Sequence, residues 1–118
     1  MRVRAHPGSL RKLHSDRRLV LSGASAAKNR DVDVIGREEL EAYVRERDFR
    51  ALVRHYKLES SSRPNLILHV VDGEWPFPEN LREAPQAVVA VDLIESGNAR
   101  SRRAGNALFN RLNRALTR

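Results

Sequence analysis

The chain lacks cysteine and any long hydrophobic run, and these absences exclude several classes of protein. None of its 118 residues is cysteine, so a disulfide framework and a thiolate metal site are both excluded. No apolar run approaches the roughly 20 residues that a bilayer-spanning helix needs. The first residues also lack the apolar centre of a secretory signal. We therefore expect a cytoplasmic protein with no membrane segment, and the length favours one domain.

Recognisable catalytic and metal-binding motifs are also missing. The four histidines do not have the spacing of metal-ligand pairs, so we predict no metal and no other cofactor. His69 lies in an apolar run and is expected to be an exposed strand residue. Ser22 and Ser25 flank Gly23 without forming a nucleophile elbow, and Ser22 is predicted to cap a helix. Aromatic residues make up only 5% of the chain, which argues against a stacking platform for single strands.

Positive charge is abundant and unevenly distributed. The formal net charge is +7; residues 1–30 carry +7, residues 31–96 carry −6, and residues 97–118 carry +6 without a single acid. Two basic ends around an acidic middle indicate an anionic partner, either nucleic acid or an acidic protein surface. The candidate contact residues are the basic side chains of these ends: Arg11, Lys12, Arg17, Arg18, Arg100, Arg102, Arg103, Arg111 and Arg114.

Local patterns predict a flexible basic arm at 1–17 and an α/β domain at 18–118, with a small mixed sheet of about three strands and four to five helices. Strands are expected at 18–22, 31–35 and 65–71, where apolar residues cluster or alternate. Helices are expected at 24–28, 37–57, 85–94 and 98–116, and the segment 37–57 is expected to bend or divide into two helices near Asp48. Two prolines make residues 74–78 irregular.

Several side chains receive specific predictions. Val88, Val91 and Ile94 are expected to face the core, and Asp92 to cap a helix or pair with an arginine. Trp75 and Phe77 lie in the proline-rich loop, where they are either a core plug or an exposed anchor for a partner.

An enzyme remains an alternative. Asp31 and Asp33 would point to the same side of a strand, and Asp72 follows a later strand. Carboxylate oxygens suit Mg²⁺, and two such ions could clamp an in-line transfer. This arrangement imitates a nucleotidyltransferase. A purely structural or oligomerising domain is a third possibility.

An ordered set of short motifs resembles the C-terminal domain of antitoxins and transcriptional regulators from actinobacterial abortive-infection, type IV-like toxin–antitoxin systems. The motifs are LSGASAA at 21–27, EAYV at 41–44, YKL at 56–58, PNLIL at 64–68, WPF at 75–77 and APQAVVAVDL at 84–93. The resemblance implies an α/β fold, DNA-linked regulation and a nucleotidyltransferase-like toxin as partner. Family members usually carry an N-terminal winged helix, which we do not expect the residues before the first motif to form. We therefore predict an antitoxin-like module that binds a toxin, DNA or RNA, or a second copy of itself.

Overall fold

Two parallel strands, β3 (Leu40–Arg45) and β4 (Leu66–Val71), form the centre of the sheet in the computed structural model, which describes residues 1–27 and 39–116. The helix α3 (Glu46–Tyr56) connects them. Two short antiparallel strands lie at the edges, β1 (Arg2–Val3) beside β4 and β2 (Val20–Leu21) beside β3. The order is β1-β4-β3-β2, so the predicted mixed α/β fold is confirmed.

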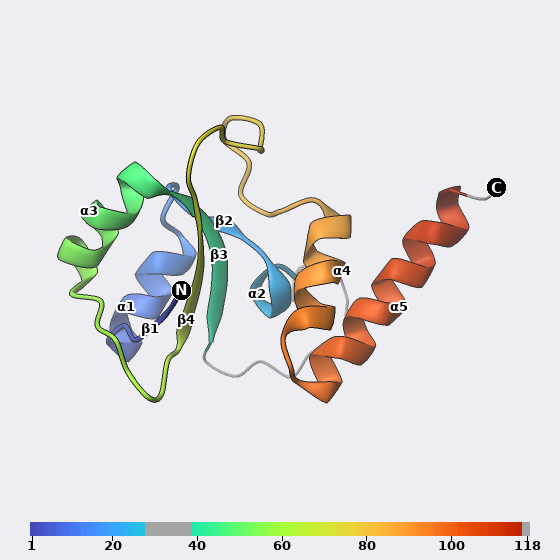
Figure 1. The fold of residues 1–118 in the computed structure, drawn as a ribbon, viewed down its shortest axis with the longest axis horizontal. Helices are drawn as coiled ribbons and strands as arrows, with labels where there is room; N and C mark the ends of the chain where they lie inside the picture. Colours follow the sequence, from blue (N-terminus) through green and yellow to red (C-terminus); the bar gives the residue numbers. More distant parts are fainter. Residues whose placement is uncertain (28–38, 117–118) are drawn as a thin grey trace.

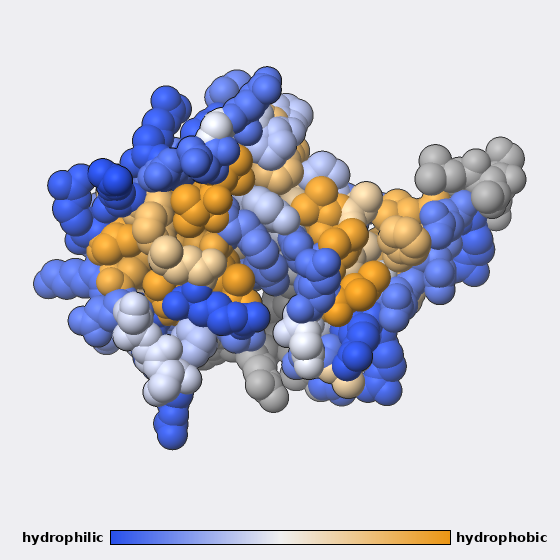
Figure 2. Space-filling view, viewed as in Figure 1, coloured by the Kyte–Doolittle hydropathy of each residue, from blue (hydrophilic) through white to orange (hydrophobic). Residues whose placement is uncertain are grey.

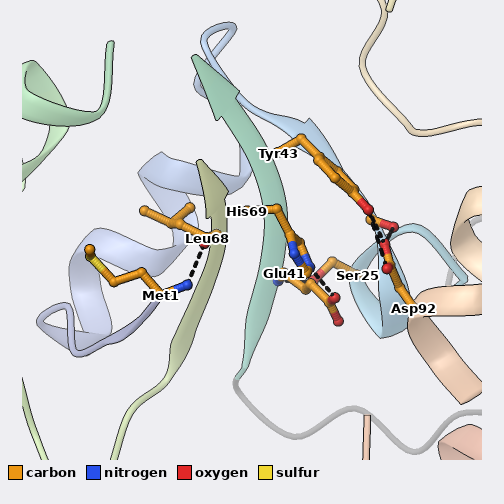
Figure 3. Close-up of polar contacts among 8 residues, drawn as sticks. Met1, Ser25, Glu41, Tyr43, Leu68, His69 and Asp92 are labelled. Carbon is orange, nitrogen blue, oxygen red and sulfur yellow. Dashed lines mark hydrogen bonds and ion pairs between the residues drawn. The ribbon is translucent and has the colours of Figure 1, made fainter. Parts of the chain in front are cut away.

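Helices cover both faces of this sheet (Figure 1). The helices α1 (Pro7–His14) and α3 lie on one side, while α2 (Gly23–Ala27) and α4 (Gln86–Glu95) lie on the other. The long helix α5 (Ala99–Leu116) packs on the outer side of α4. Side chains of β3 alternate between the two faces of the sheet. Leu40, Ala42 and Val44 are buried, whereas Glu41 and Tyr43 are partly exposed and point toward α4 (Figure 3).

The N-terminal residues are ordered, so the predicted flexible arm at 1–17 is wrong. They form β1 and α1, and Val3, Ala5 and Leu13 are buried. The buried Asn65 side chain binds Ala5 in both directions, accepting from its N–H at 2.8 Å and donating to its carbonyl at 2.7 Å. The apolar residues of this segment are too few to show a helix or strand period in the sequence. In the structure they nevertheless attach an edge strand and a helix to the core.

The predicted helix at 37–57 is also wrong in its first part. Residues 40–45 form the strand β3, and the helix begins only at Glu46. Leu40, Tyr43 and Val44 have helical spacing, but Leu40, Ala42 and Val44 equally satisfy the period of two that a strand requires. Neither the expected bend nor a division into two helices appears near Asp48, since α3 continues through that residue. The predicted strand at 31–35 lies outside the described residues.

Five other predicted elements agree with the structure, among them α2, which begins one residue before the predicted helix at 24–28. The strands β2 and β4 lie within the predicted ranges, and residues 74–78 are irregular. The helices α4 and α5 begin and end within two residues of the predicted bounds. Asn98 caps α5, because its Oδ1 accepts hydrogen bonds from the N–H groups of Arg100 and Ser101 at 2.9 and 3.3 Å.

The predicted buried face of α4 is wrong. Val91 is 42% exposed, and Val88 and Ile94 are partly exposed, whereas the buried residues are Val89, Ala90, Asp92 and Leu93. This helix is apolar on nearly every side, so hydrophobic periodicity could not identify which of its faces packs against the rest of the protein.

The close packing of α4 and α5 depends on Gly105. A Cβ at this position would lie 2.7 Å from the Ala90 carbonyl oxygen and 2.8 Å from the Leu93 Cβ. We expect Gly105→Ala to lower the free energy of unfolding by up to roughly 2 kcal/mol, because overpacking costs about 1–3 kcal/mol and the helix-propensity gain is about 1 kcal/mol. Urea unfolding measures the change. The exposed neighbour provides the control Asn106→Ala, and an equal rise in the urea midpoint for both variants would contradict the packing argument.

Candidate functional site

An arginine-lined pocket lies between the α1–β2 connection, the end of β3 and the loop that precedes α4. Its volume is about 440 Å³. We call it the arginine pocket; its lining includes four arginines, one glutamate and the indole of Trp75. The complete lining is Ser15, Arg17, Arg18, Val20, Arg45, Trp75, Pro78, Glu79, Asn80, Leu81 and Arg82.

Arg18 is held in the pocket wall by a bidentate ion pair. Its Nε and Nη2 donate to the two carboxylate oxygens of Asp16 at 2.9 and 2.7 Å, and the Tyr56 hydroxyl donates to the same carboxylate at 2.9 Å. The hydrogen bonds from Arg18 lower the pKa of Asp16 to about 2. The Arg18 guanidinium therefore has a fixed direction before any ligand arrives.

Two of the other pocket arginines, Arg82 and Arg45, are also oriented by protein atoms. Arg82 donates to the carbonyl oxygens of His14 and Ser15 at 3.0 and 3.3 Å. The guanidinium carbon of Arg45 lies 4.5 Å from the centre of the Trp75 ring, a cation–π distance. Its Nη2 also lies 3.4 Å from the Glu79 carboxylate, which is 84% exposed and therefore holds it weakly.

The two predicted aromatic anchors lie together beside this pocket. Trp75 and Phe77 make an edge-to-face contact with ring centres 5.2 Å apart, and Phe77 makes a second such contact with Tyr43. Both are partly buried and pack against the core, while the Trp75 ring also lines the pocket. Their position therefore combines features of a core plug and of a contact surface.

The structure divides the predicted basic contact residues among three places. Arg17 and Arg18 line the arginine pocket, while Arg11 and Lys12 are exposed on α1. The remaining five lie on α5, which is separated from the sheet by α4 (Figure 1). These α5 residues form a second basic surface of exposed arginines: Arg100, Arg102, Arg103, Arg111 and Arg114.

A second polar site lies between the sheet and α4 (Figure 3). The buried Asp92 carboxylate accepts hydrogen bonds from the Ser22 hydroxyl at 2.5 Å and from the Tyr43 hydroxyl at 2.9 and 3.2 Å. Beside it, His69 Nε2 lies 2.7 Å from the Glu41 carboxylate, and the His69 ring stacks on Tyr43 at 4.6 Å. We call these five residues the polar cluster.

The polar cluster corrects two predictions. Asp92 binds two hydroxyl groups and not the expected cap or arginine, because its helix face is turned toward the sheet. His69 is only partly exposed and contacts an acid on the neighbouring strand. The Glu41 hydrogen bond raises the pKa of His69, and burial together with the Asp92 carboxylate raises the pKa of Tyr43. Tyr43 is therefore a neutral donor at physiological pH.

The residues of the alternative enzyme are not brought together by the described part of the chain. Asp72 is exposed immediately after β4, while Asp31 and Asp33 lie outside the described residues. A different set can offer metal ligands: one donor atom each from Glu41, His69 and Asp92, all within 4.8 Å of one another.

Sequence reasoning missed residues of both sites because they come from distant segments. Arg45 and Arg82 belong to the arginine pocket but lie in the acidic middle of the chain. Glu41 and Tyr43 were assigned to a helix, and only the alternation of buried residues at 40–44 could have placed them on one strand face.

Comparisons with protein-family models, curated proteins and solved structures gave no match. The antitoxin resemblance therefore remains a prediction. Across residues 1–27 and 39–116, none of the helices has the length and apolar character that a membrane crossing requires.

Asp16 should contribute to stability in a pH-dependent manner. Its folded-state pKa is lowered from 3.8 to about 2, so its contribution is complete above about pH 5 and is lost as the pH falls through about 2. We expect Asp16→Asn to lower the free energy of unfolding by roughly 1–2 kcal/mol at pH 7 and by almost nothing near pH 2. Chemical denaturation across this pH range measures it, with the exposed Asp72→Asn as the matched control. A cost independent of pH would show that the ion pair is not its source.

Proposed function

We propose that the chain is a non-enzymatic, antitoxin-like regulatory module that binds the phosphate backbone of nucleic acid through the arginine pocket. One observation carries this proposal: Arg17, Arg18, Arg45 and Arg82 line a single pocket together with an indole ring and only one carboxylate. The three segments that supply them are far apart in the sequence, so no single basic run accounts for the concentration of positive charge.

The chemistry of these side chains suits phosphate. A guanidinium is planar and always charged, and it presents parallel N–H groups that match two phosphate oxygens. Asp16 fixes one guanidinium, and backbone carbonyls fix another, so less side-chain entropy is lost when a phosphate binds. Trp75 offers a ring edge or face to a sugar or an unpaired base beside the phosphate.

The arginines of α5 offer a second surface for contact with phosphate groups. They are exposed on one helix that carries no acid, which provides an electrostatic contact for a polyanion. Contacts to phosphate position a protein on nucleic acid without reading sequence. The proposed binding is therefore salt-dependent and tolerant of sequence.

Charge-neutralising variants test the arginine pocket. We expect Arg17→Gln with Arg45→Gln to weaken binding to duplex DNA or RNA by on the order of tenfold and to lower the salt slope by about 2, because two phosphate contacts are lost. Fluorescence anisotropy of a labelled oligonucleotide across a salt series measures both quantities.

The matched control removes the same charge elsewhere. Arg50 and Arg54 are exposed on α3 and do not line the pocket, so Arg50→Gln with Arg54→Gln should change affinity much less. Equal losses for the two double variants would show a diffuse charge effect, and no binding by the parent chain at low salt would refute the proposal.

A toxin partner is the second candidate, favoured by apolar side chains on the surface of α4 and α5. Val91 and Phe109 are 42% and 41% exposed, and hydrophobic residues gather over these helices (Figure 2). The adjoining arginines suit an acidic protein surface. The same face could also take a second copy of the chain.

Co-expression with a tagged nucleotidyltransferase-like toxin tests this candidate. We expect the parent chain and the Asn106→Lys control to co-purify with the toxin. The double variant Val91→Lys with Phe109→Lys should no longer co-purify, because its two charges would be buried at the contact. Retention of all variants would contradict docking on this face. Sedimentation of the chain alone shows whether a second copy binds there.

A further inference from the structure

Three potential metal ligands converge between the sheet and α4, although they are separated by up to 51 positions in the sequence. Glu41 comes from β3, His69 from β4 and Asp92 from α4. One donor atom of each lies within 4.8 Å of the other two. In Figure 3 the three side chains point into the same space.

The parallel register of the sheet explains why Glu41 and His69 lie together. Glu41 is paired with Ile67, and Tyr43 with His69, so the acid and the imidazole point to the same face from neighbouring strands. Their contact at 2.7 Å follows directly. The buried face of α4 then presents Asp92 to that pair, because this helix covers the same side of the sheet.

Neighbouring groups hold the two carboxylates in position. The hydroxyls of Ser22 and Tyr43 donate to Asp92, an arrangement that fixes its direction and leaves further oxygen lone pairs for another ligand. Gly23 has a φ of 55°, and a Cβ on it would lie 2.1 Å from Glu41 Oε1. Any larger residue at that position would displace the Glu41 carboxylate. Such outer groups are a regular feature of metal centres.

We propose that Glu41, His69 and Asp92 form a binding site for a divalent transition-metal ion of the zinc type. One imidazole nitrogen and two carboxylate oxygens are a donor set that zinc accepts, whereas Mg²⁺ and Ca²⁺ favour oxygen ligands alone. Donors on one tetrahedral zinc ion lie roughly 3.5 Å apart, given bond lengths of about 2.0–2.2 Å. Small side-chain rotations would bring the present atoms to that separation.

Solvent can reach the site from one side. Glu41 also lines a pocket of about 300 Å³ together with Leu93, Ser96 and Ser101, and the His69 side chain is 36% exposed, so an ion can approach these two ligands from solvent. Binding replaces the hydrogen bond between His69 and Glu41, and the proton that they share leaves to solvent. The bound ion would join α4 to both central strands and stabilise the folded chain.

Titration of the parent chain with ZnCl₂ by calorimetry tests the proposal, with Co²⁺ absorption as a readout of the ligand set. We expect one ion per chain, visible Co²⁺ bands and a raised Tm. His69→Gln and Glu41→Gln should each weaken binding by roughly 100-fold, since loss of even an outer partner costs about 10–100-fold. Both glutamines preserve hydrogen-bonding capacity, so the apo fold should survive.

His55→Gln is the matched control, because His55 is exposed on α3 and lies outside the cluster. Retained affinity in His55→Gln with loss in both cluster variants would establish the site. No zinc binding by the parent chain would overturn it and leave the cluster as a hydrogen-bonded network. Equal binding by His69→Gln, Glu41→Gln and the parent would overturn it as well, because the ion would then lie elsewhere.

Discussion

The hydrogen bonds to the Asp92 carboxylate hold α4 against the sheet. A buried carboxylate is costly unless its oxygens are satisfied, and here Ser22 and Tyr43 supply the donors. They join α4 to the residue before α2 and to the central strand β3. Because α5 packs mainly on α4, the same bonds fix the position of the basic C-terminal helix. They also turn Asp92 toward Glu41 and His69, so the polar cluster depends on this connection.

The arginine pocket depends on a second long-range connection, between the N-terminal segment and the loop before α4. Arg82 donates to the carbonyls of His14 and Ser15, and the loop backbone pairs with β2 through Leu21 and Ala84. These contacts bring the loop carrying Trp75 next to the ion pair of Arg18. The concentrated charge is thus a product of tertiary structure. Repulsion among the guanidinium groups is offset by Asp16, by backbone carbonyls and by the indole ring.

The sequence predicted those elements whose signals are local. The run at 65–71 reads as a strand, and Asn98 with the apolar stripe at Ala104 and Leu108 reads as a capped helix. The prediction of secondary structure failed at 40–45, where the same residues fit both a helix period and a strand period. The prediction of the buried face failed at 88–94, where the helix is apolar on nearly every side. Arg17 and Arg18 were predicted to contact a partner, and Trp75 to be either a core plug or an anchor, but their common pocket was not predicted. The polar cluster could not be assembled without knowing that β3 and β4 are parallel neighbours, nor the arginine pocket without knowing that the loop before α4 pairs with β2.

The central claim is that a polyanion occupies the arginine pocket, and Trp75 reports on it directly because it is the single tryptophan of the chain. The decisive measurement is its emission during titration with a short unlabelled duplex at low salt. A saturable change in Trp75 emission, which tracks complex formation and is reversed by added salt, is the predicted result. Formation of the complex with unchanged Trp75 emission would contradict the account and place the nucleic acid elsewhere on the protein.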